Sequence, residues 1–151
     1  MFLVSPCTAD DPALRSLVDA MTAELVPVYG LPPDAHPAPM APEARFLLVR
    51  CEGEAVGCCA VQPVGPGVCE LKRMFVSPAV RGTGAAGALL ARAERLASVL
   101  GADRMRLETG IRQPAAMRLY ERAGYLRIAN YPPHEGDPLS ACYEKGLHAG
   151  R

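Results

Sequence analysis

The sequence predicts an α/β protein with a mixed, mostly antiparallel sheet of six to seven strands, a central parallel βαβ unit and helices on both faces. Three observations predict this class. Short β-prone runs joined by tight turns follow one another between residues 45 and 76, which indicates consecutive antiparallel strands. Residues 69–101 read as a strand, a glycine-rich turn and a helix. A further strand begins at Arg104, soon after this helix, and parallel pairing across the helix is expected.

The amino-terminal part of the chain predicts a strand, a helix and a loop. Residues 2–4 form a short predicted strand, which the following Ser-Pro pair ends. Asp10 or Asp11 is placed to cap a helix that has a proline in its first turn and apolar residues at helical spacing. Residues 27–42 contain repeated prolines, which exclude a regular helix and favour an extended loop.

The middle of the chain contains the elements around which the rest is arranged. Residues 45–51 and 54–64 predict a hairpin around a Glu-Gly pair, and residues 69–76 predict the next strand. From Ala85 onward apolar residues recur at helical spacing, and Gly101 stands where a helix-ending glycine is expected.

The carboxy-terminal part predicts three more strands and one helix. Residues 104–108 form the strand after the crossover helix. Pro114 suits the first turn of a helix that Gly124 ends. Residues 125–128 and 140–145 are the last predicted strands, with a turn-rich loop between them.

Composition limits the kinds of partner that the chain is expected to have. A length of 151 residues predicts one domain over residues 1–151. Sixteen basic residues balance sixteen acidic ones, so nothing suggests a nucleic-acid partner. No apolar run approaches the ~20 residues that span a bilayer, and no signal peptide is evident. We expect a soluble, cytoplasmic protein without a membrane partner, and the sequence leaves open whether it is a monomer or a homodimer.

Six cysteines raise the question of disulfides or a metal site. No Cys-x-x-Cys pair and no spacing typical of metal ligands occurs. Cys58 and Cys59 are neighbours, so they point to opposite faces of the predicted strand. We therefore expect buried free thiols, and no metal is required.

The glycine-rich turn before the central helix predicts an anion site. The first four amides of a helix lack partners within the helix and carry the positive end of its dipole. Gly82 and Gly84 remove side chains that would keep a phosphate from these amides, and Arg81 adds a positive charge beside them.

Two other phosphate motifs compete with this interpretation. Gly82, Gly84 and Gly87 spell G-x-G-x-x-G, and Glu108 follows where a dinucleotide fold would place an acid. In that fold, however, the first glycine follows its strand immediately, whereas residues 77–81 intervene here. The chain before the motif also favours tight strand–strand connections. A P-loop is weaker still, because no Gly-Lys-Ser/Thr follows.

Residues 81–86, Arg-Gly-Thr-Gly-Ala-Ala, resemble the Arg/Gln-x-x-Gly-x-Gly/Ala signature of the GNAT-type N-acetyltransferases, in which this turn holds the pyrophosphate of coenzyme A. Residues 70–74, 107–110 and 113–121 resemble the same family's other elements in the right order. The resemblance covers about half of the chain. It implies the acyl-CoA N-acyltransferase fold and acetyl-CoA as cosubstrate. The implied reaction is direct attack on the thioester by a primary amine of a small molecule or peptide.

The resemblance also implies which residues act. Tyr120 matches the family's leaving-group tyrosine, and a phenol can protonate the departing thiolate. Gln113 stands where many members have asparagine, which is a departure from the pattern. The implied cofactor-binding residues are Met74, Phe75, Val76, Arg81, Gly82, Thr83, Gly84, Ala85, Ala86, Gln113, Ala116 and Tyr120.

An amine acceptor needs a base, and two carboxylates are candidates. Glu70 resembles the base of many GNAT enzymes in its place on the strand before the turn, although such a residue is also typical of a cross-strand ion pair. Glu108, on the neighbouring strand, is the alternative. The residues expected near the acceptor are Tyr29, Arg73, Glu108 and Tyr131.

The sequence leaves one rival function open. A non-catalytic acyl-CoA-binding module would keep the same turn without turnover. A nucleophilic cysteine pathway is less favoured, because no cysteine stands in a recognisable Cys/His/Asp arrangement. The acceptor itself is not identified by the sequence.

Overall fold

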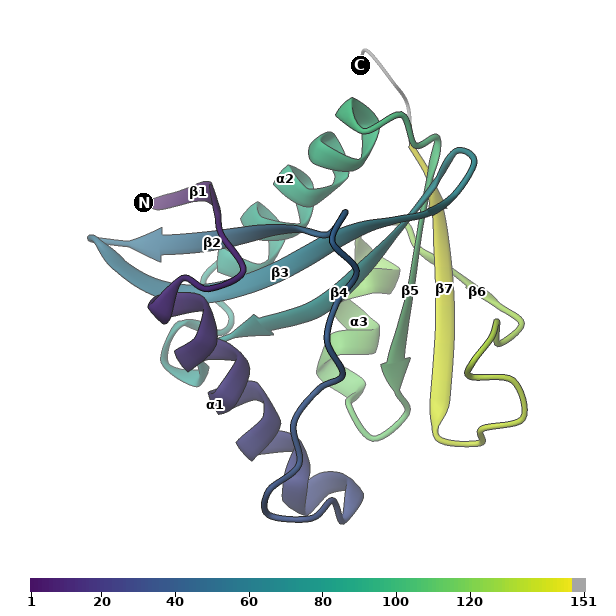
Figure 1. Cartoon of the computed structure of the whole chain (residues 1–151), viewed down its shortest axis with the longest axis horizontal. Helices are drawn as coiled ribbons and strands as arrows, with labels where there is room; N and C mark the ends of the chain where they lie inside the picture. Colours follow the sequence, from purple (N-terminus) through teal and green to yellow (C-terminus); the bar gives the residue numbers. More distant parts are fainter. Residues whose placement is uncertain (148–151) are drawn as a thin grey trace.

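The computed structural model describes residues 1–147 and shows one seven-stranded sheet between helices (Figure 1). The strand order is β1-β2-β3-β4-β5-β7-β6. Of the strands in residues 1–147, only β4 and β5 pair in parallel; the other neighbours are antiparallel. The predicted mixed sheet with a central βαβ unit is therefore confirmed, and a fold made of repeated parallel strand–helix units is excluded.

None of the helices in residues 1–147 is long and apolar enough to cross a membrane.

The structure contains the predicted elements, with small shifts at their ends. The elements are β1 (Phe2–Cys7), α1 (Pro12–Tyr29), β2 (Arg45–Cys51), β3 (Glu54–Gly65), β4 (Val68–Val76), the 3-10 turn η1 (Pro78–Val80), α2 (Ala85–Val99), β5 (Arg104–Gly110), α3 (Pro114–Arg122), β6 (Leu126–Ile128) and β7 (Ser140–Gly146).

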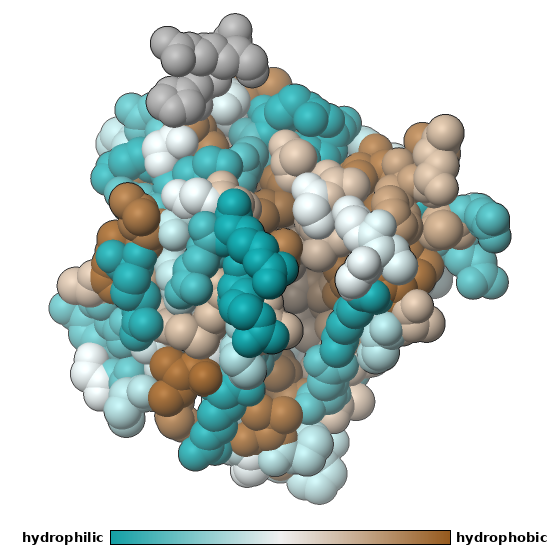
Figure 2. Space-filling model, turned by 180° about the vertical axis from the view of Figure 1, so that it is seen from behind, coloured by the Kyte–Doolittle hydropathy of each residue, from teal (hydrophilic) through white to brown (hydrophobic). Residues whose placement is uncertain are grey.

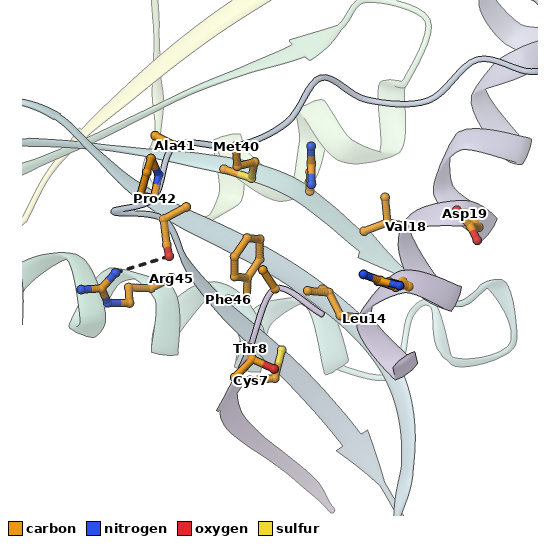
Figure 3. Close-up of a pocket in the computed structure, with 14 residues that line it drawn as sticks. Cys7, Thr8, Leu14, Val18, Asp19, Met40, Ala41, Pro42, Arg45 and Phe46 are labelled. Atoms are coloured by element: carbon orange, nitrogen blue, oxygen red, sulfur yellow. Dashed lines mark hydrogen bonds between the residues drawn. The ribbon is translucent and has the colours of Figure 1, made fainter. Parts of the chain in front are cut away.

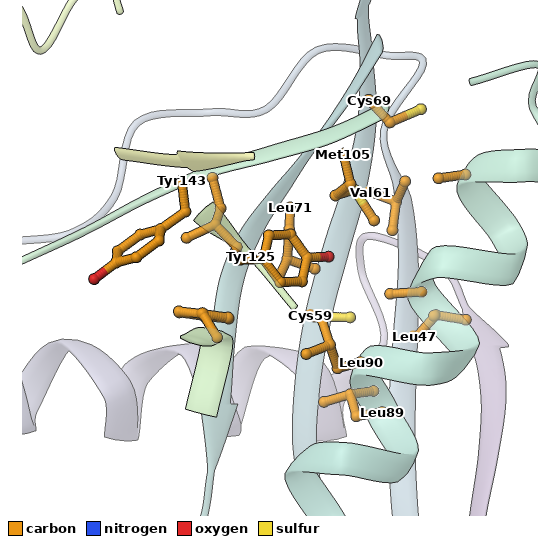
Figure 4. Close-up of a cluster of buried hydrophobic side chains, with 14 of the residues drawn as sticks. Leu47, Cys59, Val61, Cys69, Leu71, Leu89, Leu90, Met105, Tyr125 and Tyr143 are labelled. Atoms are coloured by element: carbon orange, nitrogen blue, oxygen red, sulfur yellow. The ribbon is translucent and has the colours of Figure 1, made fainter. Parts of the chain in front are cut away.

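The core has two layers, one on each face of the sheet. Under α2 and α3, aliphatic and aromatic side chains such as Leu71, Leu89 and Tyr125 form the larger cluster (Figure 4). Under α1 lies a smaller cluster. Cys58 belongs to the smaller cluster and Cys59 to the larger, as strand alternation predicts. All six cysteines are free.

Two elements of the amino-terminal part are longer than predicted. β1 runs through Pro6 to Cys7; a proline is tolerated there because β1 is an edge strand. α1 continues through Pro27 to Tyr29, which corrects the expected loop. Pro27 lies in the last turns of the helix, where its fixed φ suits the helical conformation and only one backbone hydrogen bond is lost. Gly30, at φ 63°, then ends the helix.

The two central strands separate in the middle of the sheet. Parallel pairing of β4 with β5 ends at the pair Leu71–Leu107, and both strands continue beyond it. β4 bulges against β3 at this point, and Arg73 takes a left-handed conformation at φ 55°. Figure 1 shows the strands diverging from there. The divergence leaves the end of β4 without a neighbour on its β5 side.

Candidate active site

A cleft of about 760 Å³ lies beside the separated end of β4. Its walls come from α1, β4, the turn before α2, the start of α2, and α3 with the residues before it. The face of the molecule that carries α2 and α3 is hollowed between hydrophilic side chains (Figure 2). The cleft brings together ten of the twelve predicted cofactor residues: Met74, Phe75, Val76, Arg81, Gly82, Gly84, Ala86, Gln113, Ala116 and Tyr120.

The glycine turn presents bare backbone to the cleft. Gly82 and Gly84 have φ values of 79° and 98°, which other residues rarely adopt. Gly84 is the N-cap of α2 and supplies no side-chain hydrogen bond, so the first amides of the helix stay available. A Cβ at Gly82 or Gly87 would meet no atom within 4 Å. The turn thus has the open space and the amide donors that fit a diphosphate.

The charge around the cleft is mostly positive. Arg112, Arg118 and Arg122 line it from α3 and the residues before α3. Glu24 of α1 is the one acidic side chain among the lining residues that the structure describes. A phosphate-bearing ligand therefore meets an electropositive wall, as coenzyme A requires.

The sequence alone suggested that Arg81 is a free positive charge, but the structure shows it in an ion pair. Its Nη2 donates to both carboxylate oxygens of Glu24, at 3.0 and 2.8 Å. Its Nε donates to the Val76 carbonyl at 2.9 Å, which ties the turn to the end of β4. Arg81 therefore joins α1, β4 and the turn, and Glu24 neutralises its charge.

Tyr120 differs from the other buried tyrosines. Tyr125, Tyr131 and Tyr143 each donate their hydroxyl to a glutamate, at 3.0, 2.9 and 2.8 Å. Among residues 1–147, Tyr120 is the buried tyrosine without such a carboxylate partner, and it lines the cleft. Burial raises the pKa of its phenol, so the proton stays on the oxygen at neutral pH. Tyr120 thus keeps its phenolic proton at the wall of the cleft.

Glu70 lies on the opposite face of the sheet from the larger cluster. Its neighbours Cys69 and Leu71 belong to that cluster, so its own side chain points to the α1 side. The carboxylate accepts a hydrogen bond from Tyr131 at 2.9 Å, and Lys72 Nζ is 3.9 Å away. Glu70 is only 7% exposed and stands one residue before the last β4–β5 pair.

Glu108 follows the last paired residue of β5 and faces the same side as Glu70. Its Oε2 accepts a hydrogen bond from Ser140 Oγ at 2.8 Å, and its Oε1 lies 3.9 Å from His134 Nε2. Its side chain is 27% exposed, against 10% for that of Glu70. The two candidate bases thus flank the point where the strands separate, one held in the interior and one nearer to solvent.

Tyr29 packs on the end of β5 and holds a cleft residue in place. Its hydroxyl donates to Gln113 Oε1 at 3.1 Å, and the Gly110 amide donates to the same oxygen at 3.3 Å. A Cβ on Gly110 would come within 1.6 Å of the Tyr29 hydroxyl, so only glycine fits under the ring. Arg112 donates to the Val28 carbonyl at 3.1 Å. Tyr29 therefore positions Gln113 and does not itself line the cleft.

Several predicted residues lie outside the cleft. The Thr83 hydroxyl donates to the Val80 carbonyl, and Ala85 is only 1% exposed, so neither side chain is free for a cofactor. Arg73 lines a different cavity. Glu70, Glu108 and Tyr131 lie on the α1 side of the sheet, beyond the lining of either cavity.

The sequence alone did not point to five other residues at the site. Arg118 and Arg122 are spaced i, i+4 on α3, and this spacing could have indicated a basic helix face. Glu24 and Arg112 carried no such signal. Arg106 places its guanidinium 4.0 Å from the centre of the Tyr131 ring, and its buried Nε has no hydrogen-bond partner among the described residues.

The sequence and the fold have counterparts in known proteins. Residues 14–125 match the acetyltransferase (GNAT) family. The chain belongs to this family. It is 39% identical over 107 residues, 70% of each chain, to a protein named IAA acetyltransferase from Azospirillum brasilense.

Solved structures agree with the assignment. A Klebsiella pneumoniae protein described as an acyl-CoA N-acyltransferase superposes with a TM-score of 0.83 at 34% identity, over 98% of this chain and 99% of that one. A GNAT family acetyltransferase from Elizabethkingia anophelis, determined with acetyl-CoA bound, has the same fold, with a TM-score of 0.71 at 19% identity over 97% and 98% of the two chains. This GNAT protein is thus an enzyme of the acetyltransferase class, with the acyl-CoA N-acyltransferase fold.

Proposed function

We propose that this GNAT protein transfers the acetyl group of acetyl-CoA to a primary amine of a small molecule or peptide by direct attack. The observation that carries the proposal is the cleft itself. There a bare glycine turn at the start of α2, the separated edge of β4 and Tyr120 all line one space. An anion site, a carbonyl-binding edge and a proton donor are the parts that acetyl transfer from a thioester needs.

Each part has a distinct role in the proposal. When bound, acetyl-CoA supplies the activated acyl group. The amides around Gly82 and Gly84 hold its diphosphate, and the backbone N–H groups of Met74 and Val76, beyond the last β4–β5 pair, polarise the thioester carbonyl. Tyr120 keeps its proton at Oη, because burial raises its pKa, and donates it to the leaving sulfur.

In this proposal the acceptor amine approaches from the α1 side and enters the gap between β4 and β5, which opens beyond the pair Leu71–Leu107. A lysine-like amine costs about 4.6 kcal/mol to deprotonate at pH 7, so a nearby carboxylate base is useful. Glu70 is the favoured base, because its burial and the Tyr131 hydrogen bond fix its orientation at the gap. Glu108, nearer to solvent, remains the alternative.

Release of free thiol from acetyl-CoA tests the proposal. A panel of amino acids, polyamines and peptides should contain at least one acceptor. Tyr120→Phe should lower kcat by about 10²-fold or more, the range of general acid catalysis, with coenzyme A affinity nearly unchanged. Tyr143→Phe is the matched control: it removes a buried hydroxyl outside the cleft lining.

Two results would count against catalysis. Coenzyme A binding without thiol release for any amine favours the acyl-CoA-binding module. Equal kcat losses in Tyr120→Phe and Tyr143→Phe would assign both hydroxyls to stability. A cytoplasmic location, a single domain over residues 1–151 and the choice between monomer and homodimer stay predictions.

A further inference from the structure

Tyr29, the last residue of α1, lines neither the cleft nor a second cavity on the α1 side of the sheet. That second cavity, of about 540 Å³, is lined by the amino-terminal half of α1, for example by Leu14 and Val18 (Figure 3). The cleft is lined by the other half of α1, from Met21 to Val28. Any effect of Tyr29 on a ligand in either space must therefore pass through another residue.

The segment between β5 and α3 holds Tyr29 in place. Arg112 lies with its guanidinium 5.8 Å from the centre of the Tyr29 ring and donates to the Val28 carbonyl at 3.1 Å. That carbonyl is one of the last four of α1, which find no amide partner within the helix. The Tyr29 hydroxyl lies directly over Gly110, where a Cβ would clash with it. The end of α1 is thus fastened to this segment.

Two hydrogen bonds fix the direction of the Gln113 carboxamide. Its Oε1 accepts from the Tyr29 hydroxyl at 3.1 Å and from the Gly110 amide at 3.3 Å. A backbone amide can only donate, so the atom that faces it has to be the oxygen. Burial raises the pKa of the Tyr29 phenol, so the hydroxyl keeps its proton at neutral pH and serves as the second donor. Because both donors lie at the oxygen, Nε2 points away from them.

The carboxamide nitrogen is a free donor at the cleft. Gln113 lines the cleft, and its Nε2 has no hydrogen-bond partner among residues 1–147. In the same part of the chain, the buried side-chain polar atom without a partner is Arg106 Nε, so Gln113 Nε2 is not buried. Gln113, Ala116 and Tyr120 follow one another at spacings of three and four residues, and all three line the cleft. The donor and the Tyr120 side chain thus face the same space.

We propose that Tyr29 is a positioning residue for the ligand of the cleft: it holds the Gln113 carboxamide so that Nε2 donates to an amide carbonyl of the ligand. The proposal rests on the proposed binding of coenzyme A and adds which part of that molecule the site selects. Coenzyme A carries amide carbonyls between its sulfur and its diphosphate, whereas adenosine 3′,5′-bisphosphate has none. A donor whose orientation is already fixed loses less conformational entropy when the ligand binds.

Calorimetric titration of the whole protein with coenzyme A and with adenosine 3′,5′-bisphosphate tests this role. Tyr29→Phe removes the hydroxyl and keeps the ring, so the Gln113 carboxamide loses one of the two contacts that fix it. Coenzyme A should bind this variant about three- to ten-fold more weakly, the effect of one neutral hydrogen bond. Adenosine 3′,5′-bisphosphate should bind it as it binds the parent. A merely structural role of Tyr29 would weaken both ligands alike.

A double-mutant cycle shows whether Tyr29 acts through Gln113. Gln113→Met replaces the carboxamide with an apolar side chain of similar length and should weaken coenzyme A by at least as much as Tyr29→Phe. In the Gln113→Met background, Tyr29→Phe should change the affinity by less than about two-fold, because the group that it positions is gone. Tyr125→Phe is the matched control: it removes a hydroxyl that donates to Glu94, outside the cleft lining, and should bind coenzyme A as the parent does.

Turnover gives a further readout. The loss in Tyr29→Phe should appear in the KM for acetyl-CoA with kcat nearly unchanged, because the contact is made to the arm of the cosubstrate and not to the reacting atoms. A fall in kcat with an unchanged KM would contradict the proposed role.

Three binding results would also overturn the proposal. These are equal weakening of both ligands in Tyr29→Phe, unchanged coenzyme A affinity in a Tyr29→Phe variant with a normal thermal unfolding curve, and additive effects of the two substitutions. A parent protein that binds neither ligand would overturn the proposed function, and this role with it. The titration of the parent therefore separates the two failures.

Discussion

Among residues 1–147, Glu24 is the acidic side chain that lines the cleft, so its negative charge opposes an anionic ligand. Its carboxylate is paired with Arg81, whose guanidinium would otherwise be free to contact a phosphate. Both side chains are more than 40% exposed, at 41% and 44%, so the pair itself adds little stability.

We expect Glu24→Gln to bind coenzyme A about three- to ten-fold more tightly, because the repulsion disappears and Arg81 is released. Titration calorimetry at two salt concentrations measures this, and the gain should shrink at high salt. Glu52→Gln, in the exposed β2–β3 turn, is the control with the same charge change and should leave the affinity unchanged. Weaker binding in Glu24→Gln would mean that the ion pair holds Arg81 in its binding position.

The two candidate bases can be separated one residue at a time. Glu70→Gln keeps an oxygen that can accept the Tyr131 hydrogen bond, and Glu108→Gln keeps one for Ser140. We expect Glu70→Gln to lower kcat/KM by about 10²-fold or more, and Glu108→Gln by less than about ten-fold. The reverse order would assign the base to Glu108.

At the scale of elements, the β4 bulge opens the cleft, and it depends on the backbone of Arg73. The residue has φ 55°, in the left-handed region that asparagine tolerates and β-branched residues do not. We expect Arg73→Val to unfold at lower denaturant than Arg73→Asn, with a free energy of unfolding lower by about 1–2 kcal/mol. Both variants remove the guanidinium, so the difference reports the backbone alone. Equal stabilities would show that the strand relaxes without strain.

The sequence predicted the elements whose signal is local. Apolar spacing from Ala85 to Gly101 defined α2, and the short connection to Arg104 predicted the parallel pair. The bulge could not be predicted, because Arg73 carries no glycine signal for its left-handed backbone. The helix through Pro27 was also missed, because neighbouring prolines dominate the local pattern while helical packing decides the structure.

The candidate site likewise contains residues that a local motif predicted and contacts that no local motif could predict. Gly82, Gly84 and Tyr120 belong to contiguous motifs, and the cleft brings these residues together as the motifs implied. The Tyr29–Gln113 hydrogen bond joins residues 84 positions apart, and the Arg81–Glu24 pair joins residues 57 apart. Such contacts depend on how α1 crosses the sheet, which no local pattern specifies.

At the scale of the whole molecule, the cleft is lined by parts of the chain from both faces of the sheet. Its lining comes from α1 on one face of the sheet, α2 and α3 on the other, and β4 between them. A ligand that contacts all of these walls stabilises their arrangement together, because it binds the folded chain and not the unfolded one.

Coenzyme A at about one hundred times its Kd should stabilise the fold by about 2.7 kcal/mol, which for a chain of this length raises Tm by about 5–10 °C. Pantetheine lacks the diphosphate, so the glycine turn cannot bind it. At the same concentration it should therefore raise Tm by clearly less than coenzyme A does. Hydrogen exchange locates the effect: protection should rise in residues 21–29 and 113–122 and stay unchanged in the edge strand β6, none of whose residues lines the cleft. Equal shifts for the two ligands would mean that the turn before α2 does not bind the diphosphate, and the assignment of the cleft to coenzyme A would fail with it.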